Sequence, residues 1–331
     1  TNAANTTTAY EYDAAGRLKK VTYPGGDSAA YHPTVTTYQQ RWTAEYGLDP
    51  GHWVQTVATG FALTERFLDA RWRPLLTRTL DTRNEADTRR VVVNRYDSEG
   101  RKTFESYPQR ADAVVSDALL PGTTSTYDAL GRIVRQVQTG GGVTSTEYLD
   151  GFQRKTTNPR SFATTQAFQA FDEPREDHVV SISAPEGVSV AIPRDSYGKA
   201  RSITRSGGGK SVTRSYVYDA YHRLCKTIEP ETGATVQGYD AADNLARKAS
   251  GQNSPGPGCE SGVAASSRID FSYDLRNRLI GTQYGDGSPS VQRTYTADGL
   301  LKTLVTPSTN WTYEYNNRRQ LKSERLAEWW Q

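Results

Sequence analysis

The chain has 331 residues, of which 35% are apolar and 10% aromatic, including 20 Tyr and 6 Trp. The apolar content is low for a thick core, whereas the aromatic content is far above that of disordered chains. The 40 basic and 37 acidic residues leave a formal net charge of +3, which argues against non-specific nucleic-acid binding. Abundant Tyr, Thr and Val with frequent Gly predict β-strands, and no apolar run is long enough to span a membrane as a helix.

The first predicted unit is built around the motif Tyr-Asp-Ala-Ala-Gly-Arg-Leu at residues 12–18. Tyr10 and Tyr12 share one face of the strand before the motif, because side chains alternate along a strand. The strand after it ends at a Pro-Gly-Gly turn over residues 24–26. Adjacent copies are about 20–24 residues apart, which matches two strands and two turns. Each unit is therefore predicted to be a β-hairpin.

Residues 31–66 contain no clear copy of the motif and are interpreted as an irregular insertion. The motif then resumes, with weaker copies at Phe67, Tyr148, Tyr239, Tyr295 and Tyr315. The clearest copies, the first included, supply the residues predicted to carry the repeat structure: Tyr12, Asp13, Gly16, Arg17, Tyr96, Asp97, Gly100, Arg101, Tyr127, Asp128, Gly131, Arg132, Tyr218, Asp219, Arg223, Tyr273, Asp274 and Arg278.

Three further segments depart from the rhythm. Residues 251–267, rich in Gly, Pro and Ser, are predicted to form an exposed flexible loop inserted into a repeat. Short helical pieces are predicted near residues 114–120 and 321–330. The two cysteines, Cys225 and Cys259, could pair, but two unrelated thiols are the favoured interpretation.

The motif also predicts the geometry of its turn. Asp at the first position and Gly at the fourth are typical of a type I turn, because the carboxylate accepts backbone N–H bonds and Gly tolerates positive φ. Asn277 and Asp243 tolerate that conformation better than most residues. Positive φ is expected at the fourth-position glycines Gly16, Gly100, Gly131 and Gly198. Slight strain is expected where His222 and Arg319 take the place of glycine.

The residues that flank the turn predict a contact across the hairpin. If Asp13 and Gly16 close the hairpin, Tyr12 and Arg17 face each other on its two strands. A guanidinium lying on a phenol ring is favourable, so this pair is expected to clasp each hairpin internally.

The chain shows no catalytic signature. The four histidines are scattered without metal-ligand spacing, and one Asp per repeat indicates a structural role rather than a pair of catalytic carboxylates. The Ser-Gly-Gly-Gly-Lys-Ser segment at 206–211 lacks the spacing of a phosphate-binding loop and is interpreted as a hairpin turn. We therefore predict a non-enzyme without cofactor or metal.

The recurring Tyr-Asp-x-x-Gly-Arg-Leu unit resembles the RHS/YD-repeat proteins, which include bacterial Rhs polymorphic toxins, the B–C cocoon of Tc toxin complexes and teneurins. The resemblance covers residues 8–28 and 64–331. It implies an all-β fold in which repeated hairpins form a large curved sheet, as a segment of a hollow shell. Bacterial members end the shell with an Asp-Pro-x-Gly core segment followed by a toxin. No such core or toxin domain is found here, and the sequence Asp-Pro-Gly at 49–51 is interpreted as a turn.

The resemblance predicts one YD/RHS-repeat region over 1–331, a segment of a longer chain that encapsulates or displays a C-terminal toxin or other cargo. Its partners would be that cargo polypeptide or the remaining shell, and its location secreted or at the cell surface. The alternative is an extracellular adhesion module that binds a glycan, a receptor or another protein, with exposed aromatics around Trp42 and Trp53. An enzyme within 31–66 or in flanking sequence is the least favoured reading.

Overall fold

The structure is a computed structural model that describes residues 5–28, 30–110, 113–171, 173–260 and 262–328. Strands make up nearly all of its regular structure. They are β1 (Ala9–Tyr12), β2 (Leu18–Thr22), β3 (Thr34–Arg41), β4 (His52–Thr59), β5 (Ala62–Leu68), β6 (Pro74–Asp81), β7 (Arg90–Tyr96), β8 (Lys102–Ser106), β9 (Gly122–Tyr127), β10 (Ile133–Gln138), β11 (Gly142–Leu149), β12 (Gln153–Thr157), β13 (Ala163–Phe171), β14 (Glu173–Ser183), β15 (Ser189–Ala191), β16 (Ser202–Gly207), β17 (Lys210–Tyr218), β18 (Leu224–Glu229), β19 (Gly233–Tyr239), β20 (Leu245–Gln252), β21 (Ile269–Tyr273), β22 (Leu279–Tyr284), β23 (Val291–Tyr295), β24 (Leu301–Val305), β25 (Thr309–Tyr315) and β26 (Leu321–Glu328).

Helix is confined to three single turns in the described residues: α1 (Glu85–Thr88), η1 (Pro185–Gly187) and η2 (Ala265–Ser267). The predicted all-β class is confirmed. The two predicted helical pieces are wrong: residues 114–120 form turns, and residues 321–328 form β26, while residues 329–330 lie outside the described residues.

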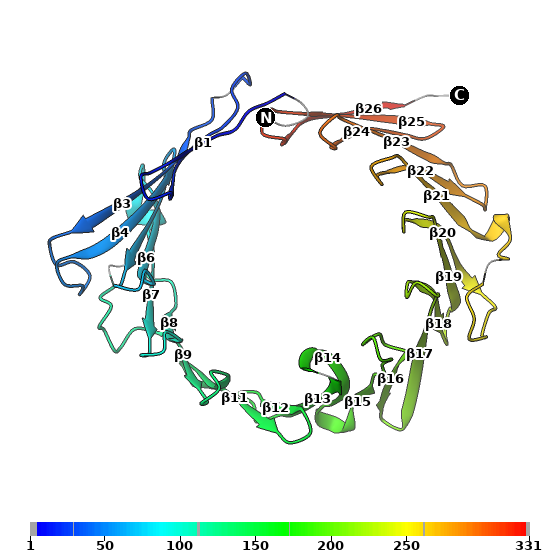
Figure 1. The fold of residues 1–331 in the computed structure, drawn as a ribbon, viewed down its shortest axis with the longest axis horizontal. Coiled ribbons are helices and arrows are strands. Elements are labelled where there is room, and N and C mark those ends of the chain that lie inside the picture. Colours follow the sequence, from blue (N-terminus) through cyan, green and yellow to red (C-terminus); the bar gives the residue numbers. More distant parts are fainter. Residues whose placement is uncertain (1–4, 29, 111–112, 172, 261, 329–331) are drawn as a thin grey trace. The chain divides into compact units, whose positions relative to one another are not determined.

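The chain divides into two compact units, Thr1–Glu147 with Thr156–Phe162, and Tyr148–Lys155 with Ala163–Gln331. In the first unit, each strand from β1 to β11 pairs antiparallel with the next strand in sequence. The same holds in the second unit from β13 to β26. Each unit, taken by itself, is a sheet of successive hairpins that bends gradually from strand to strand (Figure 1).

Residues 31–66 continue the strand ladder although they contain no clear copy of the motif. Strand β3 pairs with β4 over eight residues, and β4 pairs with β5 over seven. Their Thr, Val and aromatic residues favour strands without any motif.

The buried core of the first unit lies where two loops cover strands β4 to β7. Leu76, Val91 and Val93 are completely buried in β6 and β7, and burial of each such side chain stabilises the fold by about 1.5–3 kcal/mol. Leu48 and Ala113 pack onto them from the loops before β4 and after β8. The Asp-Pro-Gly segment at 49–51 lies in the first of these loops, in a turn as expected.

Candidate functional site

The first copy of the motif forms a turn organised by the Asp13 carboxylate. The N–H of Gly16 donates to the carbonyl oxygen of Asp13 at 3.0 Å, and the N–H of Asp13 donates to the carbonyl oxygen of Arg17 at 2.9 Å. Asp13 Oδ1 accepts from the N–H groups of Ala15 and Arg17, both at 2.9 Å. Arg17 Nε donates to the other carboxylate oxygen at 2.7 Å. One side chain therefore ties the turn, its exit strand and the Arg17 guanidinium together.

The same arrangement recurs along the chain. In four further copies, one carboxylate oxygen accepts the N–H groups two and four residues on, and the other accepts the arginine Nε at 2.7–2.8 Å; the carboxylates are Asp69, Asp128, Asp219 and Asp274. Asp97 accepts the N–H four residues on and the arginine Nε. Asn158 and Asn316 keep the two backbone contacts, and Asn316 Nδ2 also donates to Gln320 Oε1 at 3.0 Å. The backbone contacts are thus the shared part of the turn.

The fourth position of each turn has a positive φ. Gly16, Gly100, Gly131 and Gly198 have φ values of 76°, 89°, 78° and 77°, which confirms the expectation for these glycines. Positions without glycine adopt the same left-handed conformation at φ values of 58–66°: Trp72, His222, Asp243, Asn277 and Arg319. Such a conformation costs a residue with a Cβ about 1–2 kcal/mol, so the His222 and Arg319 turns are strained as predicted.

The predicted clasp within each hairpin is wrong, because the turn contains a β-bulge. The register shifts between Glu11 and Tyr12, so that Tyr12 pairs with Leu18 and not with Arg17. The Arg17 guanidinium, bonded to Asp13 of its own turn, lies 4.2 Å from the ring centroid of Tyr38, in β3. The cation–π contact therefore joins two hairpins instead of closing one.

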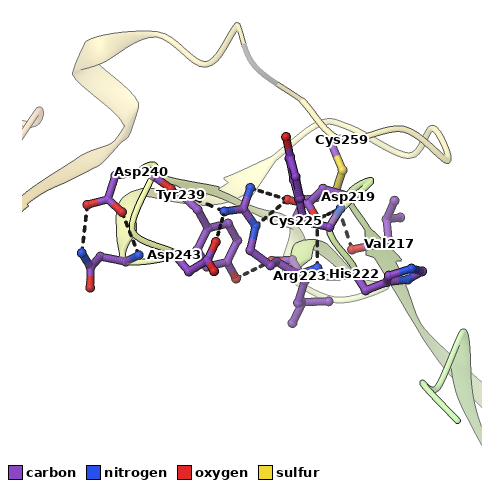
Figure 2. A network of polar contacts seen from close by, with 12 residues as sticks. Val217, Asp219, His222, Arg223, Cys225, Tyr239, Asp240, Asp243 and Cys259 are labelled. Atoms are coloured by element: carbon purple, nitrogen blue, oxygen red, sulfur yellow. Dashed lines mark hydrogen bonds and ion pairs between the residues drawn. A yellow bond between two sulfur atoms is a disulfide. The ribbon is translucent and has the colours of Figure 1, made fainter. Parts of the chain in front are cut away.

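This contact between neighbouring hairpins recurs in both units. The motif cation of one repeat lies 4.5–5.2 Å from the tyrosine ring that ends the next hairpin's first strand, in the pairs Arg73–Tyr96, Arg101–Tyr127, Lys199–Tyr218, Arg223–Tyr239 and Arg278–Tyr295. Figure 2 shows the Arg223 side chain between Asp219 of its own turn and Tyr239 of the following hairpin. The same guanidinium also contacts Asp243 Oδ1 at 2.6 Å.

The tyrosine hydroxyl completes the link. It donates to a backbone carbonyl oxygen in the preceding turn, that of the residue directly after the motif cation. In one turn Asn244 stands at the cation position. The distances are 2.7–3.2 Å, for Tyr96 to Pro74, Tyr127 to Lys102, Tyr218 to Ala200, Tyr239 to Leu224, Tyr273 to Leu245 and Tyr295 to Leu279. We call the tyrosine–cation contact and this hydrogen bond together the inter-repeat link. It always runs from a tyrosine back to the preceding turn.

Comparison with known proteins accounts for this repeated unit. The family model of the RHS repeat matches residues 1–28, the segment that holds the complete first motif. This match identifies an RHS repeat at residues 1–28. No curated protein sequence matches the chain.

Solved structures share the fold of this chain. A crystal structure of TcdB2-TccC3-Cdc42 superposes with a TM-score of 0.59 at 14% identity, over 99% of this chain and 18% of that chain. A mutant Tc holotoxin pore from Photorhabdus luminescens gives 0.59 at 14% identity, over 97% and 18%. TcdB2-TccC3-TEV gives 0.57 at 15% identity, over 97% and 18%. This chain thus spans about a fifth of the length of the chains it resembles.

The hydrogen bonds of the motif turns hold their carboxylates ionised. The pKa of Asp274 is lowered to about 2, first by the side-chain hydrogen bond from Arg278 and then by its backbone N–H. The pKa of Asp13 is lowered first by the backbone N–H of Arg17. Burial raises the pKa of the Tyr239 phenol, which keeps it neutral as a hydrogen-bond donor.

The loop inserted before β21 is anchored at two adjacent points. Cys259 is bonded to Cys225 of β18, with the two Cα atoms 5.5 Å apart, so the interpretation as two unrelated thiols is wrong. Lys226, fully buried beside Cys225, donates from Nζ to Ser254 Oγ at 3.0 Å and pairs with Glu260 Oε1 at 3.3 Å. The predicted loop is present, but its middle is held against the sheet.

The arrangement of these side chains is suited to fastening hairpins. Each carboxylate is already bonded to its own turn and arginine, and the set recurs once per hairpin, whereas a catalytic site is normally single. Among the described residues, no group of three or more His, Cys, Asp or Glu side chains could hold a metal ion. In the same residues, no helix is long and apolar enough to cross a membrane.

Proposed function

We propose that this chain forms part of the wall of an RHS-type shell that encloses a polypeptide, and that it performs no catalysis itself. The observation that carries the proposal is the inter-repeat link. Because hairpins in both units are fastened to the preceding one by the same contacts, the sheet can be extended by adding hairpins without a new core for each. A wall of this kind needs few aliphatic side chains, in agreement with the 35% apolar composition.

The partners would be the enclosed polypeptide, a toxin or other cargo, and the remaining shell. The names of the structural neighbours support this assignment, because they pair a TccC3 component with a TcdB2 component. A secreted or cell-surface location is supported by the Cys225–Cys259 disulfide, since disulfides persist mainly in oxidising compartments.

The test is to express the complete reading frame that contains the chain and to image the particles by electron cryo-microscopy. We expect a hollow particle whose internal polypeptide resists trypsin while the particle is intact. After unfolding in urea, which serves as the matched control, the same polypeptide should be cleaved. A solid or flat particle, or internal segments cleaved equally fast in both conditions, would contradict the proposal.

A second candidate function rests on an aromatic cluster in the first unit. Trp53 and Trp72 are stacked with ring centroids 5.4 Å apart, and Tyr38 meets Trp72 edge-on at 5.9 Å. Trp72 remains 47% exposed, and an exposed indole face can stack on a sugar ring or on a partner's side chain. The cluster therefore favours a glycan or protein adhesion site at this position.

Binding of the purified chain to a glycan array tests this second function. Trp72→Gly is the sharp variant, because glycine suits the positive φ of residue 72 and leaves the turn intact. Leu130→Ala, at another exposed turn position, is the matched control. Glycan binding that Trp72→Gly abolishes and Leu130→Ala retains would support the adhesion site; no binding, or equal loss in both variants, would contradict it.

A further inference from the structure

We propose that the Cys225–Cys259 disulfide is a thiol-exchange site, at which a small thiol attacks Cys259 and releases residues 253–260 from the sheet. We call these residues the strap. The proposal concerns only the second unit and is independent of the shell function. Figure 2 shows the disulfide where the strap meets β18, next to Val217 of β17.

The two cysteine residues differ in their accessibility. Cys225 lies within β18 and is only 3% exposed, whereas Cys259 lies in the exposed part of the strap. A thiolate must approach the sulfur it attacks in line with the bond that breaks, so access decides which sulfur reacts. Attack at Cys259 leaves Cys225 as the departing group. An attack at Cys225 would have to pass through the packed sheet.

The surroundings of Cys225 suit the neutral thiol that remains after the exchange. The carbonyl oxygen of Val217 lies 3.4 Å from Cys225 Sγ. In the disulfide this sulfur has no proton to share, but the reduced thiol can donate to that oxygen. The neutral, buried form of reduced Cys225 therefore has a hydrogen-bond acceptor already in place.

The chemical step is balanced by two molecules of an external thiol such as glutathione. The first thiolate forms a bond to Cys259 Sγ while the Cys225–Cys259 bond breaks, and the electron pair leaves on Cys225 Sγ, which takes a proton from water. The second thiolate attacks the glutathione sulfur of the mixed disulfide, releasing oxidised glutathione and the Cys259 thiolate. The protein disulfide gains two electrons, and two thiols are oxidised to one disulfide.

Once the disulfide is broken, only noncovalent contacts hold the strap. They include those of Ser254 and Glu260 with Lys226 Nζ and with each other, and the bond from the N–H of Ser254 to the carbonyl oxygen of Gln252. Lys226 has no exposed surface while the strap is closed, and opening lets water solvate its ammonium group. The β18 strand itself stays paired with β17 and β19 on either side, so the strap can open without unfolding the sheet.

The first experiment incubates the full chain with a reduced and oxidised glutathione buffer and maps the adducts by mass spectrometry. We expect glutathione on Cys259 at least about tenfold more often than on Cys225, from the difference in access. Hydrogen exchange is then compared before and after full reduction. Exchange in residues 253–260 should rise at least about tenfold, and exchange in β18 and β19 should change by less than about twofold.

Two variants test whether the disulfide keeps the strap closed or only cross-links two cysteines. Cys259→Ser should show open-strap exchange without any reductant. Glu260→Gln keeps the disulfide, so hydrogen exchange in its strap should stay slow when the disulfide is intact. After reduction, exchange in this strap should be faster than in the reduced unmodified chain. Equal labelling of both cysteines, an unchanged strap after reduction or in Cys259→Ser, or loss of protection throughout β18 and β19 would each overturn the proposal.

Discussion

Gly131→Ala isolates the conformational requirement of the repeat turn. Gly131 has φ of 78°, and an added Cβ would approach only Arg101 Cδ, at 3.9 Å, so no atom has to move. The cost is that of placing a side chain in the left-handed region, about 1–2 kcal/mol. The lower freedom of the unfolded chain offsets roughly 0.4–1 kcal/mol of this cost. The expected net destabilisation of about 1 kcal/mol corresponds to an increase of about fivefold in local opening.

Native-state hydrogen exchange of peptides covering residues 128–132 measures this opening directly. Gly256→Ala is the matched control, because its Cβ meets nothing within 4 Å and its φ is not positive. Gly198→Ala should destabilise its own turn more than Gly131→Ala does, because the added Cβ would also overlap the His178 ring. Exchange in residues 128–132 that is unchanged in Gly131→Ala, or changed equally by the Gly256 control, would refute the turn assignment.

Three further perturbations test the link, the turn carboxylate and the strap anchor. Tyr239→Phe removes the 2.8 Å hydrogen bond to Leu224 and should lower stability by about 0.5–1.5 kcal/mol; an unchanged urea midpoint would count against the link. The folded-state pKa of Asp274, about 2, is below its ordinary 3.8, so its stabilisation is present above about pH 4 and is lost as pH falls through 2. Asp274→Asn should therefore flatten the dependence of the urea midpoint on pH over that window, and parallel curves would contradict this. Lys226→Met should stay within about 1.5 kcal/mol of the original stability, whereas Lys226→Ala should cost about 2–5 kcal/mol; equal losses would show that the ammonium contacts outweigh the packing.

The turn could be predicted from sequence because its determinants are local. Asp13, Gly16 and Arg17 lie within five residues, and the carboxylate contacts of Asp13 remain within this segment. The partner of Arg17 could not be predicted in the same way. A single bulge shifts the register after Glu11 and directs the guanidinium to Tyr38, in a stretch without a recognisable motif. A usable signal was the distance of 21 residues from Arg17 to Tyr38, which equals one repeat step.

Other differences arose where neighbouring strands override local preferences. The copy at Phe67 looks weak in the sequence because Leu68 stands between the aromatic residue and Asp69, yet Asp69 makes all the turn contacts of a full copy. Residues 321–328 contain good helix formers, yet they pair with β25 from Thr309 to Tyr315, and this ladder outweighs helix propensity. The cysteine pairing depends on where the strap returns to β18, which spacing alone does not determine.

The direction of the inter-repeat link bears on how the protein is made. Each linking tyrosine finds both of its contacts, a cation and a carbonyl oxygen, in a turn synthesised before it, as Tyr239 does at Arg223 and Leu224. A ribosome adds about 5–20 residues per second, so one repeat takes on the order of seconds, whereas a hairpin forms in about 1–10 μs. A hairpin that carries the link thus emerges after its binding site in the preceding turn has formed, so these parts of the sheet can grow at the pace of translation.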